Sequence, residues 1–144
     1  MPLETVFSIV SSIALISWIL LFIFYSQNWV YTFLFSGVLL ILALTYLNFI
    51  IQGMSGTEEG GFNSLAEVRA LFGSDQALLA GWIHYLAFDL FVGMWIAKDG
   101  WKNDINRWML LPCLLLTFML GPVGLLTYFI IRGIKTQTIL QNPY

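Results

Sequence analysis

Long apolar runs dominate the order of hydrophobic and polar positions along the chain. No charged side chain occurs from residue 5 to residue 57, and two further apolar runs cover residues 76–97 and 109–131. Because a helix needs about 20 apolar residues to cross the bilayer core, the first run is long enough for two spans. The pattern predicts an all-α fold in a single membrane domain of residues 1–144, with four transmembrane helices at about residues 6–25, 29–51, 76–97 and 109–131.

The connections outside these spans are short, with one exception. The turn of residues 26–28 makes the first two spans antiparallel neighbours, whereas residues 52–75 form a longer segment. Within it, Ser64–Glu67 has the capping-box pattern that begins a helix. The apolar side chains of that helix would share one face: Leu65, Val68, Leu71 and Phe72. We expect a short amphipathic helix at the membrane interface, and an ordinary surface helix is the alternative.

Composition agrees with a membrane protein. Hydrophobic residues make up 59% of the chain and charged residues only 10%, whereas soluble domains carry about 25% charged residues. The formal net charge is −2, so nothing indicates a nucleic-acid partner. Glu4 precedes the first apolar run in place of a basic segment, and no small-residue cleavage site follows the run. We therefore interpret it as a retained span and not as a signal peptide.

The distribution of Lys and Arg does not predict which way four spans would be oriented in the membrane. The positive-inside rule counts Lys and Arg on each side of the membrane. For four spans the six cations divide equally, with Arg69, Arg132 and Lys135 on the side of the N-terminus and Lys98, Lys102 and Arg107 on the other side. The count is a tie.

The third predicted span carries His84 and Asp89 near its middle. With Gly81, Tyr85, Phe88 and Val92 they occupy one broad face of roughly 140°. A charged side chain in lipid at this depth costs about 2.5 kcal/mol or more, so we expect Asp89 to face the bundle interior. Ionisable residues inside a membrane indicate a functional site. The alternative is that the two side chains only hydrogen-bond neighbouring helices. Trp82, in the same span, is a candidate to line an apolar ligand site, with packing or an aromatic belt as the alternative.

The fourth predicted span contains a Gly-Pro element near its middle, residues 120–124. Pro122 removes a helical hydrogen bond and clashes with the preceding turn, so we expect a bend there towards the third span. Small and polar residues recur at helical spacing on one side: Thr117, Gly121, Gly124 and Tyr128. This stripe predicts either tight helix packing or backbone that lines a mid-membrane cavity. On the second interpretation His84 and Asp89 flank that cavity.

Cysteine and histidine counts exclude several classes of membrane protein. The chain has one cysteine, Cys113, and one histidine, His84. A quinone-coupled thiol oxidoreductase needs paired cysteines, and a two-haem cytochrome needs several axial histidines. The carboxylates near His84 have no metal-ligand spacing. We expect neither a cofactor nor a metal ion.

The second half of the chain contains a series of short motifs. The first are LFGSD at residues 71–75, AGWIH at residues 80–84 and DLF at residues 89–91. The series continues through Asp99-Gly100, Arg107, Cys113 and the GPVG of residues 121–124. In these motifs the chain resembles the plant abscisic-acid-deficient membrane proteins and their bacterial relatives, over roughly residues 65–132.

The resemblance implies a four-helix membrane protein that acts on a long apolar molecule. The plant members are tied to forming neoxanthin from violaxanthin, which opens a carotenoid epoxide and rearranges the polyene end to an allene. That chemistry needs an acid at the epoxide oxygen and a base at a polyene carbon, which suits Asp89 and His84. Residues expected to bind the substrate are Trp82, Tyr85, Arg107, Thr117, Gly121, Pro122 and Gly124. Trp108 stands where the plant pattern has a histidine, so the class of substrate is carried over and not violaxanthin itself.

Three functions remain open on these residues. The first is an intramembrane acid–base isomerase of a carotenoid or isoprenoid. The second is a non-catalytic carotenoid- or lipid-binding subunit, as a homo-oligomer or with an enzyme partner. The third is a small proton-coupled carrier built on Asp89. The chain begins directly at its first span without a transit peptide, so we expect a multi-pass protein of a bacterial inner membrane.

Overall fold

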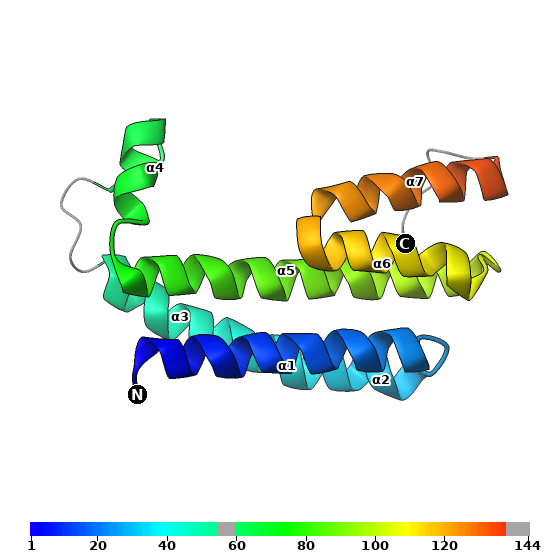
Figure 1. Cartoon of the computed structure of the whole chain (residues 1–144), viewed down its shortest axis with the longest axis horizontal. Helices are drawn as coiled ribbons and strands as arrows, with labels where there is room; N and C mark the ends of the chain where they lie inside the picture. The colour runs from blue at the N-terminus through cyan, green and yellow to red at the C-terminus, as the bar shows by residue number, and fades with distance from the viewer. Residues whose placement is uncertain (55–59, 138–144) are drawn as a thin grey trace.

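The fold is helical throughout the part of the chain that the structure describes. The structure is a computed structural model and describes residues 1–54 and 60–137, in which no strand occurs. Its elements are α1 (Leu3–Phe24), α2 (Asn28–Phe33), the π-helix η1 (Leu34–Leu39), α3 (Leu40–Met54), α4 (Leu65–Leu71), α5 (Asp75–Lys102), α6 (Arg107–Leu120) and α7 (Pro122–Thr136) (Figure 1).

Three helices among the described residues are long and apolar enough to cross a membrane. They are Leu3–Phe24, the continuous helix Asn28–Met54 and Asp75–Lys102, of 22, 27 and 28 residues. The first three predicted spans are therefore confirmed as candidates. The helix Asn28–Met54 includes the wide π-helical turns of η1 in its middle, which the hydrophobic pattern did not indicate. α5 packs against both α1 and α3 and is the central helix of the bundle (Figure 1).

The fourth predicted span is not one helix. α6 and α7 have 14 and 15 residues, so at about 1.5 Å per residue neither covers a bilayer core of about 30 Å. α7 runs back alongside α6 (Figure 1). Gly121, at the turn between them, lies against Asp89 in the middle of α5, while Arg132 of α7 bonds Asp99 near the end of α5. The bend towards α5 is present, but it forms a helical hairpin, and the predicted count of four spans is not confirmed.

The sequence explains why the hairpin turns at this point. Gly121 has φ +40° and ψ −92°, in the region where only glycine is unstrained. Pro122 then begins α7, where its missing N–H is harmless. A Cβ atom at Gly124 would overlap the backbone nitrogen of Thr117 and approach the carbonyl of Cys113 to 2.6 Å. Small size at positions 121 and 124 therefore serves the reversal and the close packing of α6 on α7.

A buried ionic cluster holds the hairpin to α5. Arg132 Nε lies 2.6 Å from Asp99 Oδ2, and the Tyr128 hydroxyl donates to the same oxygen at 2.5 Å. The side chains of Arg132 and Asp99 are 6% and 14% exposed. The cluster fixes the end of α7 beside the end of α5.

A helix is present between the second and third spans, as predicted, and it is α4, whereas its place at a membrane interface stays a prediction. Its cap follows the predicted pattern, because Ser64 Oγ accepts from the Glu67 backbone N–H at 3.2 Å. The next helix, α5, is capped by Ser74, which accepts from the Ala77 N–H at 3.2 Å. α4 stands roughly at right angles to the beginning of α5 and projects away from α1 (Figure 1). Residues 55–59 of the connecting segment lie outside the described residues.

Candidate functional site

α5 directs His84 and Asp89 towards different neighbours. Five residues of α-helix place two side chains about 140° apart around the axis. His84 is exposed and stacks on Phe88, with ring centroids 4.4 Å apart, and its ring lies 5.9 Å from that of Tyr46 in α3. Asp89 is only 9% exposed and faces the tip of the hairpin. The burial of Asp89 agrees with the expectation that it faces the bundle interior.

The Asp89 carboxyl group lies against the backbone of the hairpin turn. Its Oδ1 atom is 2.5 Å from the point that a Cβ of Gly121 would occupy, so only glycine allows this contact. Its Oδ2 atom is buried and has no hydrogen-bond partner among the described residues. The adjacent beginning of α7 carries the partial positive charge of a helix N-terminus. Asp89 is therefore a buried acid beside polar backbone.

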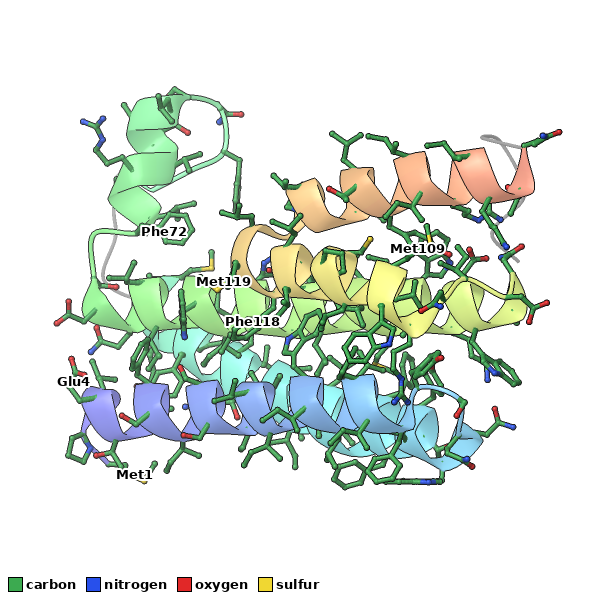
Figure 2. The ribbon with its side chains drawn as sticks, turned by 45° about the vertical axis from the view of Figure 1, so that its right-hand side comes forward. Met1, Glu4, Phe72, Met109, Phe118 and Met119 are labelled. Carbon is green, nitrogen blue, oxygen red and sulfur yellow. The ribbon has the colours of Figure 1, made fainter. Side chains whose placement is uncertain are left out.

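Tyr85 connects α5 to the hairpin. Its hydroxyl donates to the carbonyl oxygen of Phe118 at 3.0 Å. In a continuous helix that carbonyl would accept from residue 122, but Pro122 has no N–H, so Tyr85 supplies the donor that the sequence removes. Asp89 lies four residues further along α5, about one turn away on the same side of the helix. Figure 2 shows Phe118 in the last turns of α6, on the side that faces the rest of the bundle.

A large cavity lies at the end of the bundle where α5 begins. Its volume is about 1160 Å³, above the range of about 300–1,000 Å³ that is typical of small-molecule pockets. Four helices contribute mainly apolar side chains to its wall, including Phe7 of α1, Tyr46, Ile50 and Met54 of α3, Val68 and Leu71 of α4, and Leu78, Trp82, His84 and Tyr85 of α5. Phe72 follows α4 and lies between α4 and α5 (Figure 2). We call this space the end pocket.

Three residues that we expected at a site lie in the wall of the end pocket, namely Trp82, His84 and Tyr85. The indole N–H of Trp82 donates to Ser11 Oγ at 3.0 Å, which turns the ring towards α1. Asp89 and residues 121–124 are not part of the wall. The end pocket therefore does not join His84 to Asp89 and the Gly-Pro element, because the hairpin meets α5 on another side.

The other expected residues lie in the hairpin or at the far end of the bundle. Thr117 is buried and donates to the Cys113 carbonyl at 2.8 Å, next to Gly124. Arg107 begins α6, and its Nη2 atom donates to the carbonyl of Ile23, at the end of α1, at 3.0 Å. Its guanidinium also lies 5.1 Å from the centre of the Tyr25 ring. Arg107 thus hydrogen-bonds the last turn of α1, at the end of the bundle opposite the end pocket.

Sequence reasoning missed the contributions of the first two helices and of Phe72. Phe7, Ile50 and Met54 sit in apolar stretches in which no position stands out. Tyr46 offered a signal, because it is a tyrosine deep within an apolar run, and it now lies beside His84. No three His, Cys, Asp or Glu side chains gather as a metal site would need in the described part of the chain.

Comparison with known proteins places the chain in a family. The family model described as ABA DEFICIENT 4-like matches residues 5–128. No curated protein matches the chain, and no solved structure matches it either. The match extends from α1 into α7, so it also includes the first two long helices, which precede the motifs of residues 65–132. Because it covers most of the chain, the protein belongs to the ABA DEFICIENT 4-like family of membrane proteins.

Proposed function

We propose that this protein is a multi-pass protein of a bacterial inner membrane that binds a carotenoid or related isoprenoid in the end pocket and isomerises it by acid–base catalysis. The observation that carries the proposal is the pocket itself, a space of about 1160 Å³ with a mainly apolar wall and few polar groups. An isoprenoid chain has the same character, long and apolar with a polar group at its end. The membership of the family agrees with this class of ligand, which the sequence resemblance implies.

The polar groups of the wall would act on the polar end of the ligand. Opening an epoxide and forming an allene needs one proton at the epoxide oxygen while the C–O bond breaks. It also needs removal of one proton from a polyene carbon, whose C–H electron pair forms the new π bond. Atoms and electrons balance without an oxidant or reductant. His84 and Tyr85 line the pocket, and Asp89 follows Tyr85 by about one turn of α5, on the same side of the helix. Such proton transfers by side chains typically contribute about 10²–10⁴-fold to a rate.

The roles in this proposal follow from position. Tyr85 gives the proton to the oxygen and regains it from Asp89, and His84 takes the proton from carbon. Trp82 forms part of the apolar wall. Gly121, Pro122 and Gly124 shape the hairpin that holds Asp89 beside Tyr85, whereas Thr117 and Arg107 lie away from the pocket and take no part in binding.

Filling the end pocket should abolish pigment binding. Leu78 lines the pocket and is 59% exposed, so Leu78→Trp occupies the space without disturbing the core. Leu115 is 55% exposed and lies in α6, outside the pocket wall, so Leu115→Trp is the matched control. In a host that makes carotenoids, we expect pigment to copurify with the unmodified protein and with Leu115→Trp. The amount of pigment per amount of purified protein should be at least tenfold higher for both than for Leu78→Trp. Equal pigment on both variants would contradict the assignment of the pocket.

Conversion should fail while binding is retained when the acid–base groups are removed. We expect His84→Ala and Asp89→Asn each to lower product formation at least 100-fold, in line with the loss of one proton-transferring group. The measurement is chromatography of pigments from a host that supplies an epoxidised carotenoid, with the amount of folded protein as reference. Unchanged conversion in both variants would refute the catalytic roles.

A second candidate is binding without conversion. The observation that favours it is the separation of the ionisable pair, since His84 stacks on Phe88 while Asp89 is enclosed by the hairpin. In that case pigment copurifies unchanged even with the unmodified protein.

A further inference from the structure

The hairpin changes where the cations of the chain lie. In a continuous fourth span, Arg132 and Lys135 would lie at the end of the bundle where α5 begins. In the structure, α7 returns to the end where α5 stops, because Arg132 bonds Asp99 at 2.6 Å. Lys135 follows in the last turn of α7. Both cations therefore belong to the same end as the loop between α5 and α6.

Contacts confirm that the remaining cations of this end lie together. Lys98 Nζ lies 2.6 Å from Asn28 Oδ1, so the last turns of α5 meet the turn between α1 and α2. Arg107 reaches the last turn of α1 through the Ile23 carbonyl. Lys102 is the last residue of α5. We call this end, with Lys98, Lys102, Arg107, Arg132 and Lys135, the basic end.

The opposite end, with the end pocket, carries fewer cations, whereas the basic end holds two carboxylates, Asp99 and Asp104, beside its five cations. Of the six Lys and Arg residues in the chain, the pocket end carries only Arg69 of α4. Its described acidic residues are Glu4, Glu67 and Asp75, of which Glu4 and Asp75 belong to the wall of the end pocket. The even division of cations that four spans would give becomes five against one.

This asymmetry has a physical consequence in a membrane. Lys and Arg near the ends of spans remain on the cytoplasmic side during insertion, and they are attracted by the anionic lipids of that leaflet. We propose that the basic end docks on anionic phospholipid headgroups at the cytoplasmic face through its exposed cations, Lys102, Arg107 and Lys135, so that the end pocket opens towards the opposite leaflet. The N-terminus then lies outside the cytoplasm and the end of α7 lies inside. Together with the proposed function, on which this last point rests, the pocket takes its apolar ligand from the leaflet away from the cytoplasm.

Labelling of single cysteines in intact cells tests the orientation directly. The background is the full chain with its buried Cys113 replaced by Ser. Three exposed positions then receive one cysteine each: Leu65→Cys at the pocket end, Trp108→Cys at the basic end and Gln137→Cys after α7. A membrane-impermeant maleimide is applied to intact cells, and labelling is divided by that in permeabilised cells. We expect a ratio near one for Leu65→Cys and near zero for Trp108→Cys and Gln137→Cys.

The three positions separate the ways in which the proposal could fail. Labelling of Trp108→Cys and not of Leu65→Cys would overturn the orientation. Labelling of Gln137→Cys together with Leu65→Cys would mean that α6 and α7 cross the membrane as one span, which removes the charge argument. Equal ratios at all three positions would show that charge sets no orientation. None of these results depends on pigment, so they are distinct from failure of the proposed function.

Charge substitution tests the cause of the orientation. Lys102→Glu combined with Lys135→Glu removes two cations of the basic end, and we expect a measurable fraction of inverted molecules, seen as labelling of Trp108→Cys in intact cells. Arg69→Gln, which removes the cation of the opposite end, should leave the labelling unchanged. An unchanged orientation in the double variant, in membranes with and without anionic lipid, would overturn the role of the basic end.

Discussion

Replacing Arg132 by alanine should destabilise the protein by about 3–5 kcal/mol, the usual cost of breaking a buried ion pair by removing one partner. Arg132 is 5% exposed, and its guanidinium faces Asp99 at 2.6 Å. Asp99 Oδ2 accepts from both Arg132 and Tyr128, so in the Arg132→Ala variant it would keep only the hydrogen bond from the Tyr128 hydroxyl. The hairpin should then separate from the end of α5.

The measurement is the free energy of unfolding in mixed micelles. Lys135→Ala is the matched control, because Lys135 is an exposed cation in the same helix and its loss should change stability by no more than about 0.5 kcal/mol. Protease cleavage within residues 121–136 should also become faster in Arg132→Ala alone. Equal stability of the two variants would mean that the cluster does not hold the hairpin in place.

Three features of this fold could be predicted from short stretches of the sequence: the long helices, the start of α4 and the burial of Asp89. Apolar length identified the three long helices, and the pattern of Ser64 and Glu67 placed the start of α4. The depth of Asp89 within an apolar run predicted that it would be buried. Each of these features depends on a residue and its neighbours in the chain, so one sequence was sufficient.

The direction of the chain after Gly121 could not be predicted in this way. A glycine followed by proline is compatible with a kinked span and with a complete reversal, and hydropathy is the same for both. The reversal is held by contacts distant in sequence, above all Asp99 with Arg132 and Asp89 with Gly121. The choice between a kink and a hairpin therefore depends on the tertiary structure.

The candidate site shows the same division. His84, Tyr85 and Asp89 were identified because polar groups are rare within apolar helices. The way in which these three side chains group could not be predicted, because it depends on which side of α5 each neighbouring helix occupies. Tyr85 reaches the hairpin because Pro122 leaves the Phe118 carbonyl without a helical donor, and His84 meets Tyr46 because α3 crosses that side of α5.

Replacing Gly124 by alanine should open the hairpin, although it adds only one methyl group. The added Cβ would overlap the backbone nitrogen and the hydroxyl of Thr117 and lie 2.6 Å from the Cys113 carbonyl. Backbone atoms of a helix cannot rotate away as a flexible side chain can, so α7 must move as a whole. Overpacking of this kind costs about 1–3 kcal/mol and occasionally more.

Gly37→Ala is the matched control for this substitution. Gly37 lies in the apolar π-helical turns of η1, where a Cβ would meet only the Phe33 ring at 3.9 Å, an ordinary contact. Because alanine favours a helix over glycine by about 1 kcal/mol, Gly37→Ala should unfold at the same temperature as the unmodified protein or above it. Gly124→Ala should unfold at a lower temperature. A cysteine placed at Gln137 in this variant reports on the hairpin in intact cells, because its labelling ratio rises from near zero when the opened hairpin crosses the membrane. Thermal unfolding in detergent measures the first effect. If Gly124→Ala were as stable as Gly37→Ala, then α6 and α7 would not be packed as closely as the hairpin requires.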